Sequence, residues 1–451
     1  MNQRLVALIL SLLYLASLST ARGQSEEPKP RRLTLHEAVQ MALKQNHLVR
    51  ISELKVDEKQ HAKDVARSAY FPHITNESRV FHVTDTQFIQ IATGSLGTVG
   101  GTQIPVQPVT LNQGGRTIVT SGTGVVQPLT QLFTKIRPEN DIARADLDAT
   151  RANAKETENE VALRVHTIYY SVLIAQLHRN ASEARIKAAE ELKSERIQEV
   201  KYGSVLEQDL IESKAQYLQA KQELLTTELM LTNLTMQLND VVGLPITTRL
   251  ELEAVPSEQL ESCKQEECVK TALESHPEVV AAREEVKKAS AAVKLSKADY
   301  LPDFSVFARY TYSDQVPFLA RNFGTFGGEL TYEIFDAGRR RAALEESNTR
   351  LAQARENLAR VTDDVELQVQ IAYNKLQRTW EMVDVSKELL ALRTEASRVS
   401  AQQLEKGAAL PSQADSTVAQ RFDAETLLLQ AQLDYLQAHD EMTQAMGLTP
   451  K

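Results

Sequence analysis

Strict alternation of apolar and polar residues marks the expected strands of this chain. From Phe304 to Tyr312 the even-numbered residues are apolar or aromatic, whereas Ser305, Arg309 and Thr311 occupy odd positions. A period of two is typical of a strand with one apolar and one polar face. We therefore expect strands at about 303–312 and 324–335, with a matching pair at about 73–91 and 116–133.

The remaining chain follows helical patterns. Two stretches, at about 139–202 and 340–406, contain no internal helix breaker, and at 1.5 Å per residue each would extend for roughly 95–100 Å. A compact domain of this mass would have a radius of gyration of only about 22 Å, so these helices favour an elongated molecule. Shorter helices are expected at about 35–70, 206–242, 268–300 and 412–446.

The chain repeats itself. Ala42-Leu43 recurs as Ala272-Leu273 at a spacing of 230 residues, and Gly243-Leu244 recurs as Gly447-Leu448 at a spacing of 204 residues. Two constant spacings indicate one duplicated unit with an insertion in its first copy. We place the first repeat at 24–255 and the second at 256–451.

The insertion lies between the two strands of the first repeat. Residues 86–115 carry no charge and are rich in Gly, Thr, Val and Gln. A flexible linker is one interpretation. Because strands flank the segment on both sides, we favour the tip of a long hairpin.

The N-terminus has the pattern of a secretory signal peptide, at residues 1–23. Arg4 supplies the positive charge, Leu5–Leu18 the apolar run, and Ala21-Arg22-Gly23 the cleavage site. An uncleaved anchor is the alternative. No later stretch is apolar for long enough to form a transmembrane helix, so none is expected in the mature chain.

Charge and cysteine content narrow the class further. The net charge of −9 disfavours nucleic acid as a partner. The low aromatic content of 5% favours long helices over ordinary globular domains. Cys263 and Cys268 are the two cysteines. In an oxidising compartment they would form a local disulfide; two free thiols in a loop are the alternative.

Four strands per chain raise the question of closure. Strands of about ten residues can cross a bilayer when tilted, but open sheet edges are not tolerated in lipid. Two chains would supply eight strands and three chains twelve. The pattern therefore favours an oligomeric barrel in an outer membrane, with a soluble β-layer capping a coiled coil as the alternative.

Essentially the whole chain after the expected signal peptide resembles the TolC-type outer-membrane efflux proteins. The resemblance rests on Leu35–Leu43 and its second copy, on the Tyr-x-Pro before each strand pair, and on Leu330–Arg339. It also rests on the glycines that break and close each repeat. Each segment alone is a weak signal. Their order, duplication and spacing together are specific for this family.

The resemblance implies a mainly α fold with a small β part. Long antiparallel helices would form a trimeric α-barrel that continues into a 12-stranded transmembrane β-barrel, with four strands and two internal repeats per chain. The expected location is the outer membrane of a Gram-negative-type bacterium, with an extension into the periplasm. The implied partners are two further copies of the chain, outer-membrane lipid, a periplasmic adaptor protein and an inner-membrane pump.

The implied function is the exit duct of a tripartite efflux pump that exports small molecules. The exit duct of a type I protein secretion system is the alternative with the same fold. A periplasmic coiled-coil adaptor fits less well, because such proteins have one helical hairpin and this chain has two hairpin units.

The resemblance also indicates where a gate would lie. Family members carry acidic residues six and nine positions after the glycine that ends each long helix. In the first repeat Asp209 and Glu212 occupy these positions, whereas the second repeat has Gln413 and Ser416, with Asp415 displaced by one. We take Asp209, Glu212 and Asp415 as gate candidates; for Asp209, a charge that favours the helix start is the alternative.

The turns themselves are the expected contacts with an adaptor. The candidate residues are Tyr202, Gly203, Lys406, Gly407 and Pro411. Proline is unusual in such a turn, but the first turn of a helix tolerates it.

No pattern in the chain indicates an enzyme. It lacks an HExxH motif, a phosphate-binding loop and a dinucleotide fingerprint, so we expect no catalytic residues, cofactor or metal. His36 and His47 could share a helix face, but two histidines make a poor metal site. His166 lies beside Tyr169 and Tyr170 and is interpreted as a packing residue.

Overall fold

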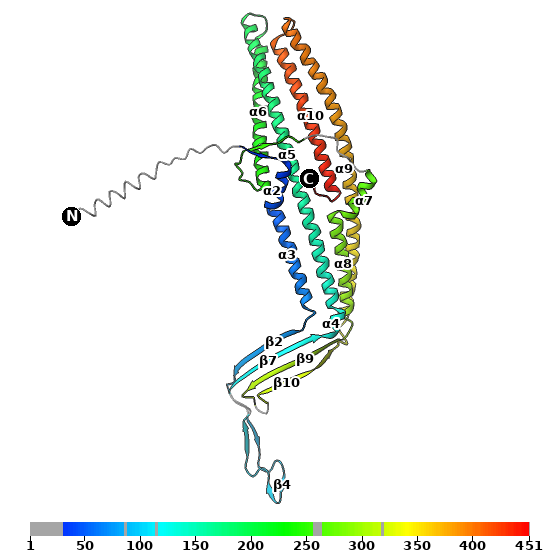
Figure 1. Ribbon diagram of the computed structural model, residues 1–451. Helices are drawn as coiled ribbons and strands as arrows, with labels where there is room; N and C mark the ends of the chain where they lie inside the picture. The colour runs from blue at the N-terminus through cyan, green and yellow to red at the C-terminus, as the bar shows by residue number, and fades with distance from the viewer. Residues whose placement is uncertain (1–29, 85–87, 113–115, 256–263, 317–319, 451) are drawn as a thin grey trace, which may run out of the picture. The chain divides into compact units, whose positions relative to one another are not determined.

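The computed structural model describes residues 30–84, 88–112, 116–255, 264–316 and 320–450 (Figure 1). The expected signal peptide and Cys263 lie outside these ranges. The chain divides into two compact units. Unit 1 draws on Met1–Ile51, Glu156–His276 and Val365–Lys451, and unit 2 on Ser52–Lys155 and Pro277–Asp364. Each unit therefore contains parts of both repeats.

Unit 1 is helical. Its helices α6 (Glu207–Val242) and α10 (Pro411–Ala445) lie beside parts of the long helices α5 (Ile136–Lys201) and α9 (Arg339–Glu405) (Figure 1). The helices α2 (Leu35–Gln45) and α7 (Gln265–Ser275) complete it. The two long helices begin and end within three residues of the positions expected from the sequence.

A small parallel sheet anchors the centre of unit 1. Strand β1 (Arg31–Leu33) pairs with β8 (Leu250–Leu252), beside a core that includes Val165 and Leu238. The hydroxyl of the fully buried Tyr169 lies 2.8 Å from the carbonyl of Glu253 and 3.0 Å from that of Leu33, and these two oxygens share its single proton. Burial raises the pKa of Tyr169 to about 12. The phenol thus fixes this short sheet to α5.

The two helices expected to run unbroken before each strand pair are each divided. In the first repeat α2 ends at Asn46, whose backbone is extended, and whose side-chain oxygen accepts a 2.8 Å hydrogen bond from the Leu48 amide. In the second repeat α7 ends at His276, because the following Pro277 disfavours helical geometry there. The next helices are α3 (His47–Ser68) and α8 (Pro277–Ala298). His36 and His47 therefore lie on different helices.

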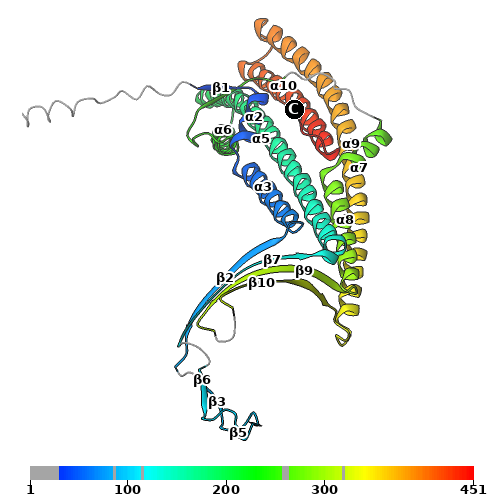
Figure 2. The same cartoon turned by 60° about the horizontal axis from the view of Figure 1, so that its bottom comes forward.

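Unit 2 contains a four-stranded antiparallel sheet in the order β10-β9-β7-β2 (Figures 1 and 2). Its strands are β2 (His73–His82), β7 (Thr117–Pro128), β9 (Asp303–Asp314) and β10 (Asn322–Thr331). The central pair, β7 and β9, joins the two repeats. Strands β2 and β10 are the edges, and each has a neighbour on one side within the described chain.

Three strand boundaries differ from the expected ones. The first strand ends at His82 rather than near 91, the second ends at Pro128 and is followed by the short helix α4 (Leu129–Thr134), and the fourth ends at Thr331. The inserted segment forms two small hairpins of its own. They pair β3 (Phe88–Ile91) with β6 (Val109–Asn112), and β4 (Thr98–Val99) with β5 (Thr102–Gln103).

The strand register separates the side chains of the sheet into two different faces. Residues directly opposite each other on neighbouring strands point to the same side, so the register assigns every residue of the four strands to one of two faces. We call the first side the apolar face; it includes Ile74, Val80, Val119, Val125, Phe304, Val306, Tyr310, Tyr312, Phe326 and Leu330. The second side, the charged face, carries Glu77, Arg79, Asp303, Arg309 and Glu329, together with the apolar Phe81, Ile118, Phe307 and Phe323. Among the described strand residues, Asp314 at the end of β9 and His82 at the end of β2 are the acidic and basic residues on the apolar face.

Polar residues on the apolar face satisfy one another. Asn76 donates to Thr123 at 2.8 Å, and Ser78 donates to Asn76 at 2.9 Å. Ser78 and Ser121 share a further hydrogen bond of 2.9 Å. These side chains need no water for hydrogen bonding, which suits a face turned toward an apolar environment.

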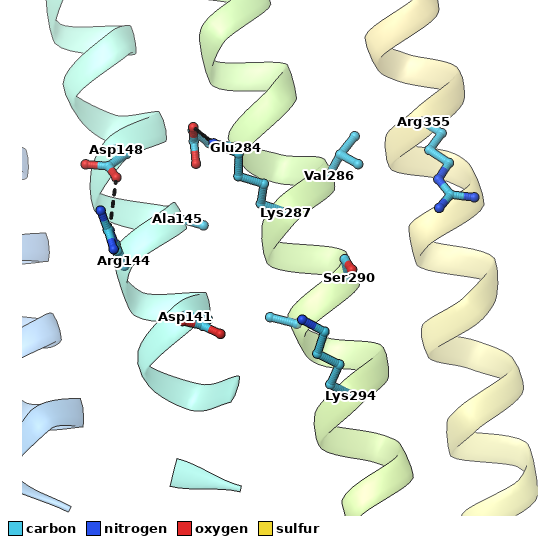
Figure 3. Close-up of a pocket in the computed structure, with 11 residues that line it drawn as sticks. Asp141, Arg144, Ala145, Asp148, Glu284, Val286, Lys287, Ser290, Lys294 and Arg355 are labelled. Atoms are coloured by element: carbon cyan, nitrogen blue, oxygen red, sulfur yellow. Dashed lines mark hydrogen bonds and ion pairs between the residues drawn. The ribbon is translucent and has the colours of Figure 1, made fainter. Parts of the chain in front are cut away.

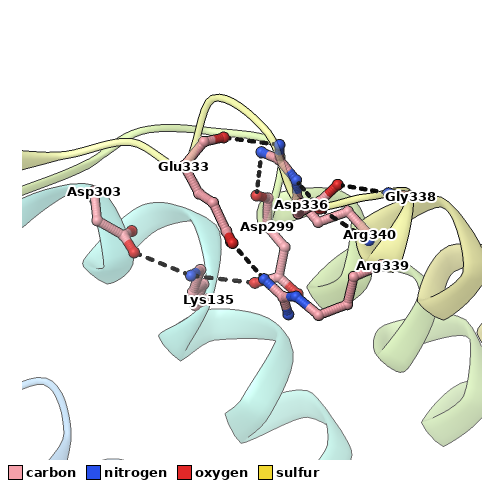
Figure 4. Close-up of polar contacts among 8 residues, drawn as sticks. All are labelled: Lys135, Asp299, Asp303, Glu333, Asp336, Gly338, Arg339 and Arg340. Atoms are coloured by element: carbon pink, nitrogen blue, oxygen red, sulfur yellow. Dashed lines mark hydrogen bonds and ion pairs between the residues drawn. The ribbon is translucent and has the colours of Figure 1, made fainter.

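Arg340 ties the end of the sheet to the start of α9 (Figure 4). Its guanidinium bonds the Asp336 carboxylate at 2.6 Å and the Glu333 carbonyl at 2.8 Å, and it lies over the rings of Tyr300 and Tyr332. The hydrogen bonds from Arg340 hold the pKa of Asp336 below its ordinary value. Leu330–Arg339 carried part of the resemblance. Arg340, the next residue, fixes the position at which this segment leads into α9.

Candidate functional site

The two turns that follow the long helices have the same geometry. Gly203 and Gly407 adopt φ angles of 73° and 68°, a left-handed conformation that favours glycine. The residue after each glycine donates its amide hydrogen bond back to the helix, from Ser204 to Glu199 at 2.9 Å and from Ala408 to Gln403 at 2.8 Å. Each repeat therefore ends its long helix with the same glycine-dependent cap.

The helix after each turn begins with a related contact. Asp209 accepts a 3.2 Å hydrogen bond from the Leu206 amide at the start of α6. Gln413 accepts a 3.3 Å hydrogen bond from the Leu410 amide at the start of α10. The carboxylate of Asp209 thus caps its own helix, and the neutral Gln413 does the same in the second repeat. This geometry supports the helix-start interpretation of Asp209 without excluding a second role.

The other gate candidates lie apart from Asp209. Glu212 is exposed on α6 and accepts a hydrogen bond of 3.3 Å from Gln216. Asp415 is half-buried on α10. Among the described residues, no hydrogen bond or ion pair joins Asp209, Glu212 and Asp415 to one another. Within one chain they do not form a cluster.

The expected adaptor contacts are accessible on the chain. Tyr202 is 78% exposed, and Lys406 is also exposed. Pro411 is the first residue of α10, the position at which a helix tolerates proline. Next to it, the buried Ser412 donates its amide hydrogen bond to Glu195 of α5 at 2.7 Å. The second turn is therefore held by the long helix of the first repeat.

A cavity of about 530 Å³ lies beside these turns, between α5, α6 and α10. Small or polar side chains line much of it, including Ala188, Gln216 and Ser416. Farther along α5, Arg185 bonds Asp423 of α10 at 3.1 Å and also pairs with Glu223 of α6. Partial burial opposes the charge on Arg185, but these carboxylates raise its pKa. Arg185 thus connects three helices near the cavity.

A buried polar network crosses the middle of unit 1. His166 of α5 lies 2.6 Å from the Asp440 carboxylate of α10, and Tyr170 donates to the same carboxylate at 2.9 Å. Burial alone would raise the pKa of Asp440, but hydrogen bonds from His166, His439 and Tyr170 outweigh it and lower this pKa. Burial also raises the pKa of Tyr170. His166 is therefore a packing residue with a specific charged partner that the sequence did not indicate.

Two helices of unit 1 expose rows of large apolar residues. On α6, Leu218 and Leu225 are 62% and 58% exposed, and their spacing of seven residues is typical of a helix-packing seam. On α9, Val385 and Leu392 are 68% and 65% exposed at the same spacing. Exposed apolar rows of this kind are typical of surfaces that contact another protein or a membrane.

A second cavity, in unit 2, does not resemble a catalytic site. It measures about 570 Å³ and is lined by charged residues of α5, α8 and α9. Arg144 pairs with Asp148 at 3.9 Å and Lys287 with Glu284 at 2.6 Å, each along its own helix (Figure 3). Ion pairs of this kind are typical of a solvated helix surface.

The described ranges contain no group of three or more His, Cys, Asp or Glu side chains placed to hold a metal ion. None of the helices within them combines the length and apolarity needed to span a bilayer. Cys268 is fully buried in α7, whereas its expected disulfide partner Cys263 lies outside the described ranges.

Residues 268–448 match the family model described as outer membrane efflux protein. No curated protein sequence matches the chain. The structure is similar to the CmeC outer membrane channel of Campylobacter jejuni, with a TM-score of 0.75 and 13% identity over 92% of this chain and 85% of that one.

Two further channels show the same likeness. The outer membrane protein VceC of Vibrio cholerae gives a TM-score of 0.72 and 14% identity over 92% of this chain and 96% of that one. The open-state MtrE outer membrane channel of Neisseria gonorrhoeae gives a TM-score of 0.69 and 16% identity over 92% of this chain and 89% of that one. At these identities the likeness shows a shared fold.

Proposed function

Since this chain carries an outer membrane efflux protein domain and has the fold of TolC-like outer membrane channels, we propose that three copies form the exit duct of a tripartite efflux pump. The observation that carries the proposal is the four-stranded sheet, which has two open edges and two chemically different faces. Each feature requires something that the chain alone does not supply.

The two faces suit two different environments. The apolar face carries aromatic and branched residues, and the polar side chains Asn76 and Ser78 on it form hydrogen bonds with neighbouring side chains. Lipid requires such internal satisfaction of polar groups. The charged face, with Glu77 and Arg309, suits the wall of a water-filled conduit. A sheet of this kind fits an outer-membrane barrel with the apolar face outward.

The open edges support closure by several chains. Strands β2 and β10 each leave one side of their backbone without a strand neighbour in the described chain, which lipid would not tolerate. Joining β2 of one copy to β10 of the next closes the sheet after three copies as a twelve-stranded barrel. The exposed apolar rows on α6 and α9 would meet in the same arrangement and close a barrel of helices.

The turns after Gly203 and Gly407 would form the inner entrance of this duct. Asp209, Glu212 and Asp415 do not cluster in one chain, but threefold symmetry would repeat each as a ring of charge. Rings of carboxylates can bind cations and control access to a pore. Tyr202, Lys406 and Pro411 would contact a periplasmic adaptor. The cavity of about 530 Å³ beside them offers an adaptor helix a place to bind.

Conductance of the purified protein tests the function. We expect outer-membrane fractions to yield a protein that opens pores in planar bilayers. Charge neutralisation by Asp209→Asn, Glu212→Gln and Asp415→Asn should weaken block by divalent cations, whereas Lys214→Gln on the exposed side of α6 serves as the matched control. Protein that forms no pores would contradict the proposal.

The cargo is tested separately in cells. Deleting the gene should raise sensitivity to small toxic compounds while leaving the profile of secreted proteins unchanged. Loss of one or a few secreted proteins without a change in drug sensitivity would instead favour the exit duct of a type I secretion system. This experiment leaves the channel itself unquestioned and distinguishes its two uses.

A further inference from the structure

The inserted segment of the first repeat contains a two-stranded ribbon with two different sides. The ribbon is the pairing of β3 with β6. Gln90 stands opposite Thr110 and lies on one side of it. The pairs before and after point to the other side, because side chains alternate along a strand. We call this other side the aliphatic face; it consists of Ile89, Ile91, Val109 and Leu111.

One chain covers the aliphatic face only in part. Ile89 and Val109 are 44% and 40% exposed. The tip of the segment has a defined backbone, in which the Leu96 amide donates a 3.0 Å hydrogen bond to the Ile104 carbonyl, and it exposes Leu96 and Val99 as well. A lone two-stranded ribbon is at best marginally stable in water, and it becomes stable when its apolar side packs on another element. The aliphatic face therefore needs a surface to pack against.

Lipid does not supply this surface in the proposed barrel. Strands β2 and β7 have ten and twelve residues, which is enough to cross a bilayer when they are tilted. Helix α3 precedes β2 and α4 follows β7, so the ribbon leaves the sheet at the end away from these helices. Between sheet and ribbon, the Val83 amide still donates a 2.8 Å hydrogen bond to the Arg116 carbonyl. The ribbon thus begins where the membrane-crossing strands have ended.

The absence of charge suits contact between copies of the ribbon. Charged residues make up 25% of the whole chain, but residues 86–115 contain none. Three chains around an axis bring the same residues of each copy together near that axis, where like charges would repel. The shorter hairpin of the second repeat does carry charge at its tip, where Arg321 pairs with Asp314 at 3.0 Å. The extended hairpin is therefore the one that a threefold axis tolerates.

We propose that the ribbons of three chains pack together through their aliphatic faces, around the threefold axis and beyond the outer end of the barrel. The inference rests on the proposed function, because it takes the three copies and the membrane-crossing sheet from it. Each ribbon would give its neighbours the apolar surface that it needs itself. The contact would continue outward from the proposed joining of β2 to β10, because β3 follows β2 along the chain.

Single cysteines on the two sides of the ribbon test this contact in the full-length protein in its membrane. Ile91→Cys places a thiol on the aliphatic face, and Gln90→Cys places one on the opposite side of the same strand. Oxidation by copper-phenanthroline should join Ile91→Cys chains into covalent dimers and leave Gln90→Cys chains separate. The protein without either substitution supplies the background from Cys263 and Cys268.

The rate of thiol labelling gives a second readout. An impermeant maleimide added from the outer side should modify Ile91→Cys at least about tenfold more slowly than Gln90→Cys, because a thiol in the contact reacts only when the contact opens. The two thiols are neighbours in the sequence. A difference between their rates therefore reports the side of the ribbon that is covered.

A charge on the aliphatic face should separate the ribbons. Val109→Lys would bring three like charges together near the axis. It should therefore abolish the Ile91→Cys dimer and raise the labelling rate of this thiol to that of Gln90→Cys. Thr110→Lys, on the opposite side of the same strand, is the matched control and should leave both readouts unchanged.

Native mass spectrometry of the same preparations keeps the inference and the proposed function apart. A trimer in which Ile91→Cys and Gln90→Cys react alike, or in which Gln90→Cys forms the dimers, would overturn the inference and leave the channel proposal standing. A trimer in which Ile91→Cys reacts slowly but forms no dimer would mean that another molecule covers the face, and would also overturn it. Chains that form no trimer would contradict the proposed function and the inference with it.

Discussion

The centre of unit 1 and the sheet of unit 2 treat their polar and apolar groups in opposite ways. In unit 1, His166, Tyr170 and Asp440 are buried and bonded to one another, and Tyr169 bonds two backbone carbonyls. In unit 2, Ile74 and Phe326 of the sheet are 71% and 88% exposed, and both edges are open. The first region is complete within one chain, and the second is not.

This difference shows which contacts one chain can supply. Buried polar groups are stable only when they are hydrogen-bonded, and in the centre of unit 1 a single chain supplies the partners of His166, Tyr170 and Asp440. A sheet with one apolar face and open edges needs lipid and neighbouring strands instead. The comparison can be tested by damaging each region and asking whether the other responds.

The largest effect should follow from disrupting the exposed row on α6. In Leu218→Glu/Leu225→Glu, charges would enter the expected contact with a neighbouring α9, and we expect monomers instead of trimers after detergent extraction. Amide hydrogens of β2 and β10 should then exchange rapidly, while those of α5 around Val165 stay protected. Hydrogen-exchange mass spectrometry measures both. The control is Gln219→Glu, an exposed change about 100° around the same helix from Leu218, which should keep the trimer. Unchanged exchange in the double variant would contradict the comparison.

Removing Asp440 should produce the next largest effect. Asp440→Ala leaves His166 without its partner in a buried site, which costs about 3 kcal/mol of unfolding free energy. Denaturant unfolding in the Leu218→Glu/Leu225→Glu background, where we expect monomers, measures this value. The control is Lys375→Ala, which breaks an exposed 2.6 Å pair with Glu441 and should cost at most about 1 kcal/mol. Equal losses of unfolding free energy in the two variants would show that the buried network contributes no more to stability than the Lys375–Glu441 pair.

Acid should weaken the same network. Because the folded-state pKa of Asp440 lies below its ordinary value of 3.8, its contribution to stability is present above about pH 4. It should be lost as pH falls through the folded-state pKa. Unfolding curves between pH 5 and pH 2 would show a steeper decline for the unchanged protein than for Asp440→Asn. Parallel declines would count against this contribution.

The smallest effects should come from the turns. Gly203→Ala and Gly407→Ala would each cost about 1 kcal/mol, because alanine is strained at positive φ. A Cβ at either position meets no atom within 4 Å, so the cost is in the backbone alone and should be equal in the two repeats. Thermal unfolding tests this equality. A much larger cost at one turn would mean that this turn has a contact that the single chain lacks.

Local pattern predicted much of this fold. The long helices were expected at 139–202 and 340–406 and occur at Ile136–Lys201 and Arg339–Glu405, because long amphipathic stretches without internal glycine leave few alternatives. The alternation from Phe304 to Tyr312 also identified the apolar face of β9 correctly. The break at Pro277 could have been foreseen from the proline, whereas Asn46 gives a weaker signal.

Contacts between distant residues could not be predicted in this way. His166 and Asp440 are 274 residues apart in the chain, and no local pattern links them. The same holds for Arg309 and Glu77, which meet only because β7 pairs with both β9 and β2. For the gate candidates, the spacing after Gly203 predicts Asp209, and that role stays a prediction; the structure shows that its carboxylate caps α6.

The mass of the protein extracted from outer membranes in mild detergent is the most direct test of closure by three chains. Native mass spectrometry should give three times the mass of the mature chain, and the assembly should dissociate only on heating. A single chain, or a protein recovered from the soluble fraction, would contradict the account.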